Sequence, residues 1–159
     1  MRLYRSLASF ATLLCVSLLL GACATSGAGG SRPPEYFANM PEREIFTSAY
    51  DNFVKAGGGG KSPVFTLDKV SLVTRIGTLH FNDGKGAAPG RISLKDAGGK
   101  TFGPWQAKGV TYGETANAFW QCEPGVVLEP GTYIIVDSDP STWSSSGKGS
   151  GLAQVYGKQ

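Results

Sequence analysis

The chain has 159 residues, with 15 lysines and arginines, 12 aspartates and glutamates, and a net charge of +3. This length suits one domain with its own core, and the dispersed basic residues argue against the concentrated positive face that a nucleic acid partner requires. One histidine and three cysteines, spread along the chain, do not meet the four closely spaced ligands of a structural zinc site.

The first segment has the order of a secretory signal peptide. Arg2 and Arg5 precede an uncharged, largely apolar run over 6–20, which is followed by two small residues before Cys23. A positive end, an apolar core and a small-residue cleavage site are the three parts of such a signal. The alternative is an uncleaved membrane anchor, but the run is shorter than the roughly 18 to 20 residues that a spanning helix needs.

The tetrapeptide Leu20-Gly21-Ala22-Cys23 resembles the lipobox of bacterial lipoproteins. The resemblance implies that the Cys23 thiol receives a diacylglycerol, that residues 1–22 are removed as the signal peptide, and that the new amino group is acylated. Two or more acyl chains anchor a protein stably without a spanning segment. We therefore expect a lipid-anchored protein of the bacterial cell envelope. Ala24, in place of an aspartate, resembles lipoproteins that reach the outer membrane of a Gram-negative host.

Processing at Cys23 would leave Cys122 without an intramolecular partner, because Cys15 leaves with the signal. The mature domain is therefore expected to lack disulfides. Cys122 lies close to two aromatic residues, a setting typical of a buried thiol rather than of a nucleophile.

The composition then separates a tether from a domain. Residues 23–40 follow the acylated cysteine with Gly, Ser, Ala and Pro, which is typical of a flexible segment, and the domain is expected over 41–159. Its first segment, from Pro41 to Lys55, has apolar residues every four positions and a proline suited to a first helical turn. This spacing predicts one short N-terminal helix that covers a sheet.

The rest of the chain consists of short apolar runs separated by turn residues such as Asn82-Asp83-Gly84 and Pro130-Gly131. Many short strands with frequent turns are typical of an all-β sandwich or barrel. We predict a single antiparallel β-sandwich of the jelly-roll kind. Its strands are expected within the runs 64–67, 70–81, 92–94, 119–122, 126–128, 133–136 and 152–156.

Several of these runs indicate how the faces of the strands are used. In 70–81 the apolar positions change parity, which predicts a bulge near Gly77. The run 92–94 alternates, as in a half-exposed strand. The run 133–136 is apolar throughout and predicts a central strand covered on both faces, whereas 96–100, with its glycines, predicts a hairpin turn.

The run from Leu128 to Ser144, centred on the sequence Gly-Thr-Tyr-Ile-Ile-Val-Asp-Ser-Asp-Pro at 131–140, resembles a domain that recurs in secreted bacterial proteins of poorly defined function. Segments 63–67 and 103–107 share in the resemblance, which extends over about 45–157. It implies a β-sandwich in an extracytoplasmic setting. It carries over no catalytic residue and names no ligand.

Asp137 and Asp139 are candidate metal ligands. With Ser138 they place three oxygen-bearing side chains at a strand end, and Ca²⁺ takes six to eight oxygen ligands. The alternative is that both carboxylates cap the turn before Pro140 by accepting backbone N–H bonds. Apart from this calcium ion, no cofactor is expected.

Trp105, Trp143 and Tyr112 are candidate ligand-binding residues. Exposed aromatic faces bind sugars, and jelly-roll sandwiches often serve as carbohydrate-binding modules. Trp105 and Trp143 lie in segments that favour exposure, whereas Trp120, within the apolar run 119–122, is expected in the core. The alternative for each aromatic is ordinary packing.

These expectations favour a non-catalytic, membrane-anchored binding module, with a glycan or cell-wall polymer as the leading ligand class. The alternative is a structural or assembly lipoprotein that binds another envelope protein. A small hydrolase is a third, weaker alternative, because His80 is the single histidine and no nucleophile motif surrounds it. Exposed, coplanar Trp105 and Trp143 would favour the first reading, and a large apolar patch or an unpaired edge strand would favour the second.

Overall fold

The computed structural model of the chain describes residues 32–49, 54–58 and 60–159. The predicted signal peptide, Cys23 and much of the predicted tether lie outside these residues. Within them, the only helical segments are two short 3₁₀ turns, η1 (Pro34–Phe37) and η2 (Asn82–Gly84). No helix in this part of the chain is long and apolar enough to cross a membrane.

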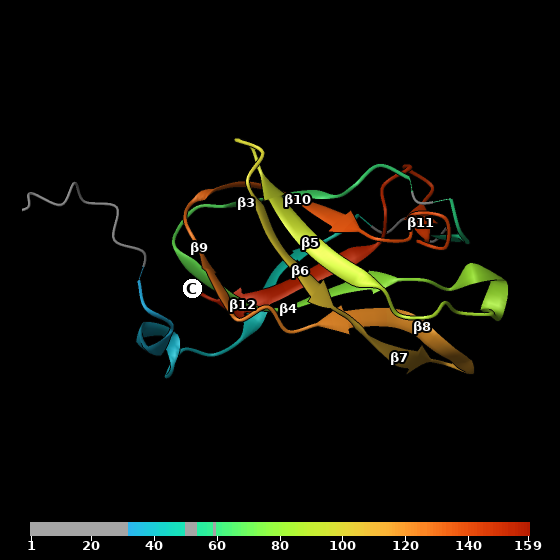
Figure 1. Cartoon of the computed structure of the whole chain (residues 1–159), viewed down its shortest axis with the longest axis horizontal. Coiled ribbons are helices and arrows are strands. Elements are labelled where there is room, and N and C mark those ends of the chain that lie inside the picture. Colours follow the sequence, from blue (N-terminus) through green and yellow to red (C-terminus); the bar gives the residue numbers. More distant parts are fainter. Residues whose placement is uncertain (1–31, 50–53, 59) are drawn as a thin grey trace, which may run out of the picture.

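Most of the described chain forms two antiparallel sheets (Figure 1). The strands of the larger sheet are, in spatial order, β1 (Arg43–Thr47), β12 (Ala153–Lys158), β4 (Ser71–Leu79), β8 (Thr115–Cys122) and β7 (Lys108–Tyr112), and β9 (Val126–Leu128) pairs with β4 as a sixth strand. Those of the smaller sheet are β3 (Val64–Leu67), β10 (Gly131–Asp137), β5 (Arg91–Asp96) and β6 (Thr101–Gln106). A separate pair joins β11 (Ser145–Ser146) to β2 (Val54–Lys55).

The two sheets face each other across one hydrophobic core. Figure 1 shows β5 and β6 crossing over β4 and β12 at an angle. Both sheets supply buried side chains to the core: Phe65, Ile92, Leu94 and Ile135 come from the smaller sheet, and Val73, Ile76, Trp120 and Val155 from the larger. The predicted all-β fold with antiparallel sheets is confirmed.

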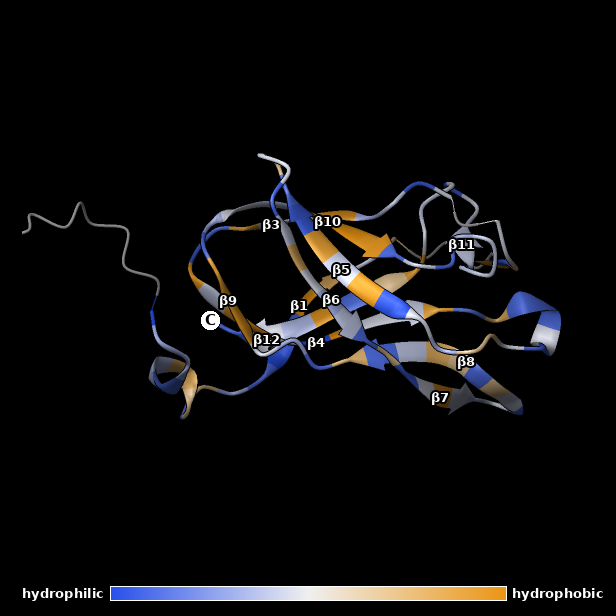
Figure 2. Cartoon of the chain, in the orientation of Figure 1, coloured by the Kyte–Doolittle hydropathy of each residue, from blue (hydrophilic) through white to orange (hydrophobic). Residues whose placement is uncertain are grey.

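Strand β5 has the alternation that the sequence predicts for a half-exposed strand. Ile92 and Leu94 are fully buried, while Arg91 and Lys95 are exposed. Figure 2 shows the resulting apolar and polar bands along β5. The predicted hairpin turn follows, where the Asp96 carboxylate accepts the backbone N–H of Lys100 at 2.8 Å.

Strand β10 is central in its sheet, but only one of its faces is covered. Tyr133 and Ile135 are buried in the core, whereas Val136 is 39% exposed. The prediction that the run 133–136 is covered on both faces is therefore wrong. The alternate side chains of β10, such as Val136, point to the outer surface of the smaller sheet, where apolar residues are tolerated.

The predicted bulge in β4 exists but lies earlier in the strand. Val73 and Ile76 are both fully buried, although a spacing of three places them on opposite faces of a regular strand. The register between β4 and β12 shifts between Val73 and Arg75, so the strand changes face there. Gly77 lies in the regular part of β4.

The helix predicted from Pro41 to Lys55 is wrong where the structure describes this segment. Strand β1 occupies 43–47, β2 contains the last two residues, and 50–53 lie outside the described residues. The register of β1 with β12 shifts within the strand, and both Ile45 and Phe46 pack against the core. This bulge breaks the alternation expected of a strand, so the apolar residues imitate helical spacing.

The predicted tether over 23–40 ends earlier than expected. Pro34–Phe37 form η1, and the Phe37 side chain is fully buried. The Lys158 ammonium group donates to the Ala38 carbonyl at 3.2 Å, which links this segment to the last strand. The folded domain thus begins before residue 41.

Candidate functional site

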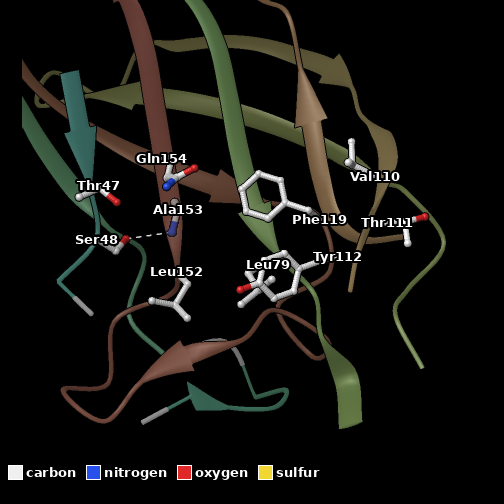
Figure 3. Close-up of a pocket in the computed structure, with 10 residues that line it drawn as sticks. All are labelled: Thr47, Ser48, Leu79, Val110, Thr111, Tyr112, Phe119, Leu152, Ala153 and Gln154. Atoms are coloured by element: carbon white, nitrogen blue, oxygen red, sulfur yellow. Dashed lines mark hydrogen bonds between the residues drawn. The ribbon is translucent and has the colours of Figure 1, made fainter. Parts of the chain in front are cut away.

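A cavity of about 420 Å³ opens on the outer face of the larger sheet, opposite the core. Strands β1, β12, β4, β8 and β7 all contribute to it (Figure 3). Apolar side chains of Leu79, Phe119 and Val110 lie beside the polar groups of Thr47 and Gln154. We call this cavity the groove.

The pairing of the strands explains why these side chains meet. Leu79 of β4 lies opposite Phe119 of β8, and Phe119 lies opposite Val110 of β7. Directly opposite residues on neighbouring antiparallel strands point to the same face. The three side chains therefore form one apolar row across the groove, and Figure 3 shows the Phe119 ring near its centre.

A second row crosses the sheet beside the first. Gln154 of β12 lies opposite both Thr47 of β1 and Gly77 of β4, and Gly77 lies opposite Gln121 of β8. Because Gly77 has no side chain, the Phe119 ring lies over it: a Cβ atom on Gly77 would come within 2.3 Å of Phe119 Cε1. The sheet thus carries an aromatic ring between two glutamines.

Charge beside the groove is already paired. The Arg75 guanidinium donates to the Glu42 carboxylate at 3.2 Å and lies over the Tyr156 ring, 4.1 Å from its centroid. The Tyr156 hydroxyl in turn donates to the Glu44 carboxylate at 3.3 Å. A guanidinium that shares its charge with a carboxylate exerts little net field on a ligand.

The structure separates the aromatic residues predicted to bind a ligand. Tyr112 lines the groove and is 64% exposed. Trp105 is half-buried and packs against the core from β6 of the other sheet. Trp143 is 2% exposed, and its indole N–H donates to the Leu152 carbonyl at 2.9 Å.

The predicted exposure of Trp143 is therefore wrong, and a platform formed by Trp105 and Trp143 is not present. The polar loop that carries Trp143 folds back over the sheet end, so its composition does not report exposure. A Cβ atom on Gly151 would come within 2.7 Å of the Trp143 ring, which shows how closely the backbone covers the indole. Trp120 is buried, as predicted.

The carboxylates of Asp137 and Asp139 are occupied by protein donors. Asp137 accepts the Thr78 hydroxyl at 2.9 Å and the backbone N–H of Asp139 at 2.8 Å. Asp139 accepts the Ser141 backbone N–H and hydroxyl and the Thr142 hydroxyl. The hydrogen bond from the Ser141 hydroxyl is the main cause that lowers the pKa of Asp139.

These contacts confirm the alternative in which both aspartates cap the turn. No group of three or more His, Cys, Asp or Glu side chains in the described part of the chain is arranged to hold a metal ion. The calcium hypothesis at Asp137 and Asp139 gains no support from this geometry, because both carboxylates already accept hydrogen bonds from protein donors.

His80 is fully buried at the end of β4, within the same polar cluster. Its Nε2 atom lies 3.1 Å from Asp137 Oδ2, and its Nδ1 atom lies 2.9 Å from the Thr142 hydroxyl. The imidazole stacks on the Trp120 ring with a centroid separation of 3.6 Å. Both ring nitrogens of His80 thus make structural contacts. They link the end of β4 to Asp137 of β10 and to Thr142 after it.

Cys122 is buried on the core side of β8, as predicted. Burial raises the pKa of its thiol to about 12. At neutral pH the group is therefore a thiol, which is a weak nucleophile.

Comparison with models of known protein families, with curated proteins and with solved structures finds no match. The function must therefore be argued from the groove itself.

Sequence reasoning found Tyr112 but not the other groove residues. Phe119 in the groove and Gln121 beside it carried a usable signal, because they flank Trp120, which the sequence analysis expected in the core. That alternation places Phe119 and Gln121 on the outer face of β8. Their meeting with Gln154 depends on strand order, which the sequence does not reveal.

Proposed function

We propose that this protein is a non-catalytic binding module of the bacterial cell envelope, and that its groove binds a glycan or cell-wall polymer. The observation that carries the proposal is an open groove in which aromatic rings lie beside hydroxyl and amide groups. Phe119 and Tyr112 supply the rings, and Thr47 and Gln154 supply polar groups.

This mixture matches the chemistry of a sugar. The C–H faces of a sugar ring are apolar and pack on aromatic rings, while its hydroxyls both donate and accept hydrogen bonds. Sites for small ligands commonly combine apolar walls with a few polar groups that fix orientation. Phe119 can serve as such a wall, and Gln154 as such a polar group.

The cellular setting in the proposal rests on the sequence. Acylation of Cys23 and removal of residues 1–22 would tether the domain to a membrane, with the outer membrane as its site in a Gram-negative host. The likeness of 128–144 to a recurring secreted domain agrees with this setting. We also propose that the two packed sheets are a variant of the jelly-roll sandwich.

The test is a calorimetric titration of the full-length protein, purified in detergent, with a panel of neutral oligosaccharides built from glucose, xylose or N-acetylglucosamine. Saturable binding that weakens several-fold in Tyr112→Ala supports the proposal, because Tyr112 is exposed and its loss should not disturb the core. Tyr36→Ala is the matched control, since Tyr36 is 48% exposed and does not line the groove. A flat titration across the panel contradicts the glycan assignment.

A second candidate, binding to another envelope protein, is favoured by the edge strand β7. All five residues of β7 are exposed, including Val110 and Tyr112. An exposed edge can accept a strand from a partner through backbone hydrogen bonds. A flat glycan titration together with a defined envelope complex that Thr111→Pro dissociates would favour this function, because proline removes a backbone donor.

A further inference from the structure

We infer that the groove binds an internal stretch of a linear, uncharged polysaccharide, with one sugar held on Phe119 between the amides of Gln121 and Gln154. The inference rests on the proposed function. It specifies the shape and charge of the ligand and the residues of the protein that contact it.

The candidate site extends beyond the groove. A smaller cavity of about 150 Å³ lies next to the groove and shares Phe119 and Gln154 with it. A third, of about 230 Å³, shares Gln121 with the second and continues past Lys108 to Glu123. The three cavities thus lie one after another beside β8, and we call this row the trough.

The length of this trough exceeds that of one sugar ring. Phe119, Gln121 and Glu123 alternate along the chain and follow the trough from end to end. Four residues of extended chain span about 13 Å. Tyr112 at one end and Glu123 at the other are both exposed, so neither end is closed by a buried side chain. A chain can therefore enter and leave, whereas a pocket for a chain terminus needs a wall.

Two side-chain amides in the trough are available to bind a ligand. Gln121 and Gln154 are both half-buried, and neither side chain makes a hydrogen bond within the described part of the chain. Neither amide belongs to the buried atoms that lack a partner, so both are open to solvent. Each amide offers two donors and one acceptor oxygen, which suits sugar hydroxyls.

The position of the two amides relative to the Phe119 ring indicates that both can contact the same sugar. Gly77 lies between Gln154 and Gln121 in one cross-strand row, and the Phe119 ring fills the space above Gly77. A sugar stacked on this ring has an amide on either side of it. The matching glutamine Gln106, farther along the trough, already donates to the Gly90 carbonyl at 2.8 Å and is less free to read a ligand.

The charged side chains near the trough indicate the charge of its ligand. Arg75 is paired with Glu42, and the far end of the trough contains one cation, Lys108, and one anion, Glu123. The two cations along the trough, Arg75 and Lys108, therefore do not outnumber the nearby carboxylates of Glu42, Glu44 and Glu123. A surface that binds an acidic polysaccharide needs an excess of cations, so the trough fits an uncharged chain.

The experiment uses full-length protein in detergent and titrates it with neutral oligosaccharides of one to five units of the sugar that binds in the test above. We expect the affinity to rise from one unit to about three and then to level off. Gln121→Ala and Gln154→Ala should each weaken binding of the trimer roughly three- to tenfold, the range for one lost hydrogen bond. Gln159→Ala, a glutamine outside the trough, is the matched control and should leave the affinity unchanged.

The outcomes separate this inference from the function on which it rests. A single sugar that binds as tightly as a trimer, or glutamine variants with unchanged affinity while Tyr112→Ala binds weakly, overturns the internal-chain model and leaves the binding module intact. Binding of oligogalacturonate but of no neutral sugar overturns the assignment of an uncharged ligand. The absence of binding to any glycan overturns both, and unfolding by urea verifies that each variant is folded.

Discussion

The Phe119 ring lies over Gly77, and a single added methyl group at Gly77 would meet it at 2.3 Å. The two residues come from neighbouring strands, β4 and β8; Phe119 lines the groove, and both residues line the smaller cavity beside it. The shape of the candidate site therefore depends on a position with no side chain at all.

Gly77→Ala is expected to displace the Phe119 ring and to lower the free energy of unfolding by about 1 to 3 kcal/mol, the usual cost of overpacking. Urea unfolding measures the loss, and the groove should bind its ligand more weakly. Gly98→Ala is the control, because Gly98 lies in the exposed turn after β5 and an added Cβ would meet only the Asp96 carboxylate at 3.3 Å. Equal stability of the two variants would contradict the close contact between Gly77 and the Phe119 ring.

The buried contact between His80 and Asp137 is expected to stabilise the fold far more than the exposed pair of Arg75 and Glu42. Removing one partner of a buried polar pair leaves the other partner buried without a hydrogen bond. Exposed pairs, in contrast, contribute about 0 to 1 kcal/mol to the free energy of unfolding. Double-mutant cycles to alanine should give a coupling of about 1 to 3 kcal/mol for His80 and Asp137. A coupling no larger than that of Arg75 and Glu42 would show that the buried cluster is not a structural tie.

Asp139 should contribute to stability in a pH-dependent way through Ser141. Hydrogen bonding lowers the pKa of Asp139 in the folded state, so its stabilising effect is present above its unfolded pKa of about 3.9 and is lost as the pH falls through the lower folded value. Ser141→Ala should raise the pKa of Asp139, and NMR titration of its carboxyl group measures the change. The variant should be less stable than the wild type at pH 7, and the difference should shrink near pH 2.

Cys122 should resist thiol reagents in the folded protein. Burial raises the pKa of its thiol to about 12, so almost no thiolate exists at pH 8 and the sulfur is covered. Mass spectrometry after exposure to iodoacetamide should show Cys122 modified only when the protein is unfolded in urea. Rapid modification of Cys122 in the native protein would contradict the burial described above.

The lipid anchor predicted at Cys23 is tested in cells of a bacterial host. Cys23→Ser should abolish incorporation of labelled palmitate and should prevent removal of residues 1–22, because serine lacks the thiol that receives the diacylglycerol. Cys15→Ser should leave both unchanged, since Cys15 lies in the segment that would be removed. Incorporation of palmitate into Cys23→Ser would contradict acylation at Cys23.

Local patterns predicted most strands of the core but missed β1 and β7, and they failed where neighbouring strands decide the outcome. Turn residues and the alternation at Ile92 and Leu94 identified strands, because both signals are read along the chain. The bulge at Ile45 and Phe46 imitated a helix, because a bulge puts consecutive residues on one side. Trp143 was predicted to be exposed because its loop is polar, yet its indole is covered by a backbone eight residues farther on.

Apart from Tyr112, the groove was not predicted, for a related reason. Gln154, Gly77 and Gln121 form one row only because β4 lies between β12 and β8. Strand order depends on contacts between residues far apart in the sequence, and no local spacing encodes it. Tyr112 was named from its aromatic side chain alone, and the strand that carries it, β7, was not predicted.

Strand β1 begins at Arg43, on the side of the chain that leads back to the proposed anchor, and ends at Thr47, which lines the groove. One strand therefore connects the attached end of the domain to its binding end. If the chain is held at Cys23, strand β1 separates Thr47 and the groove from the point where the tether enters the domain by about its own length.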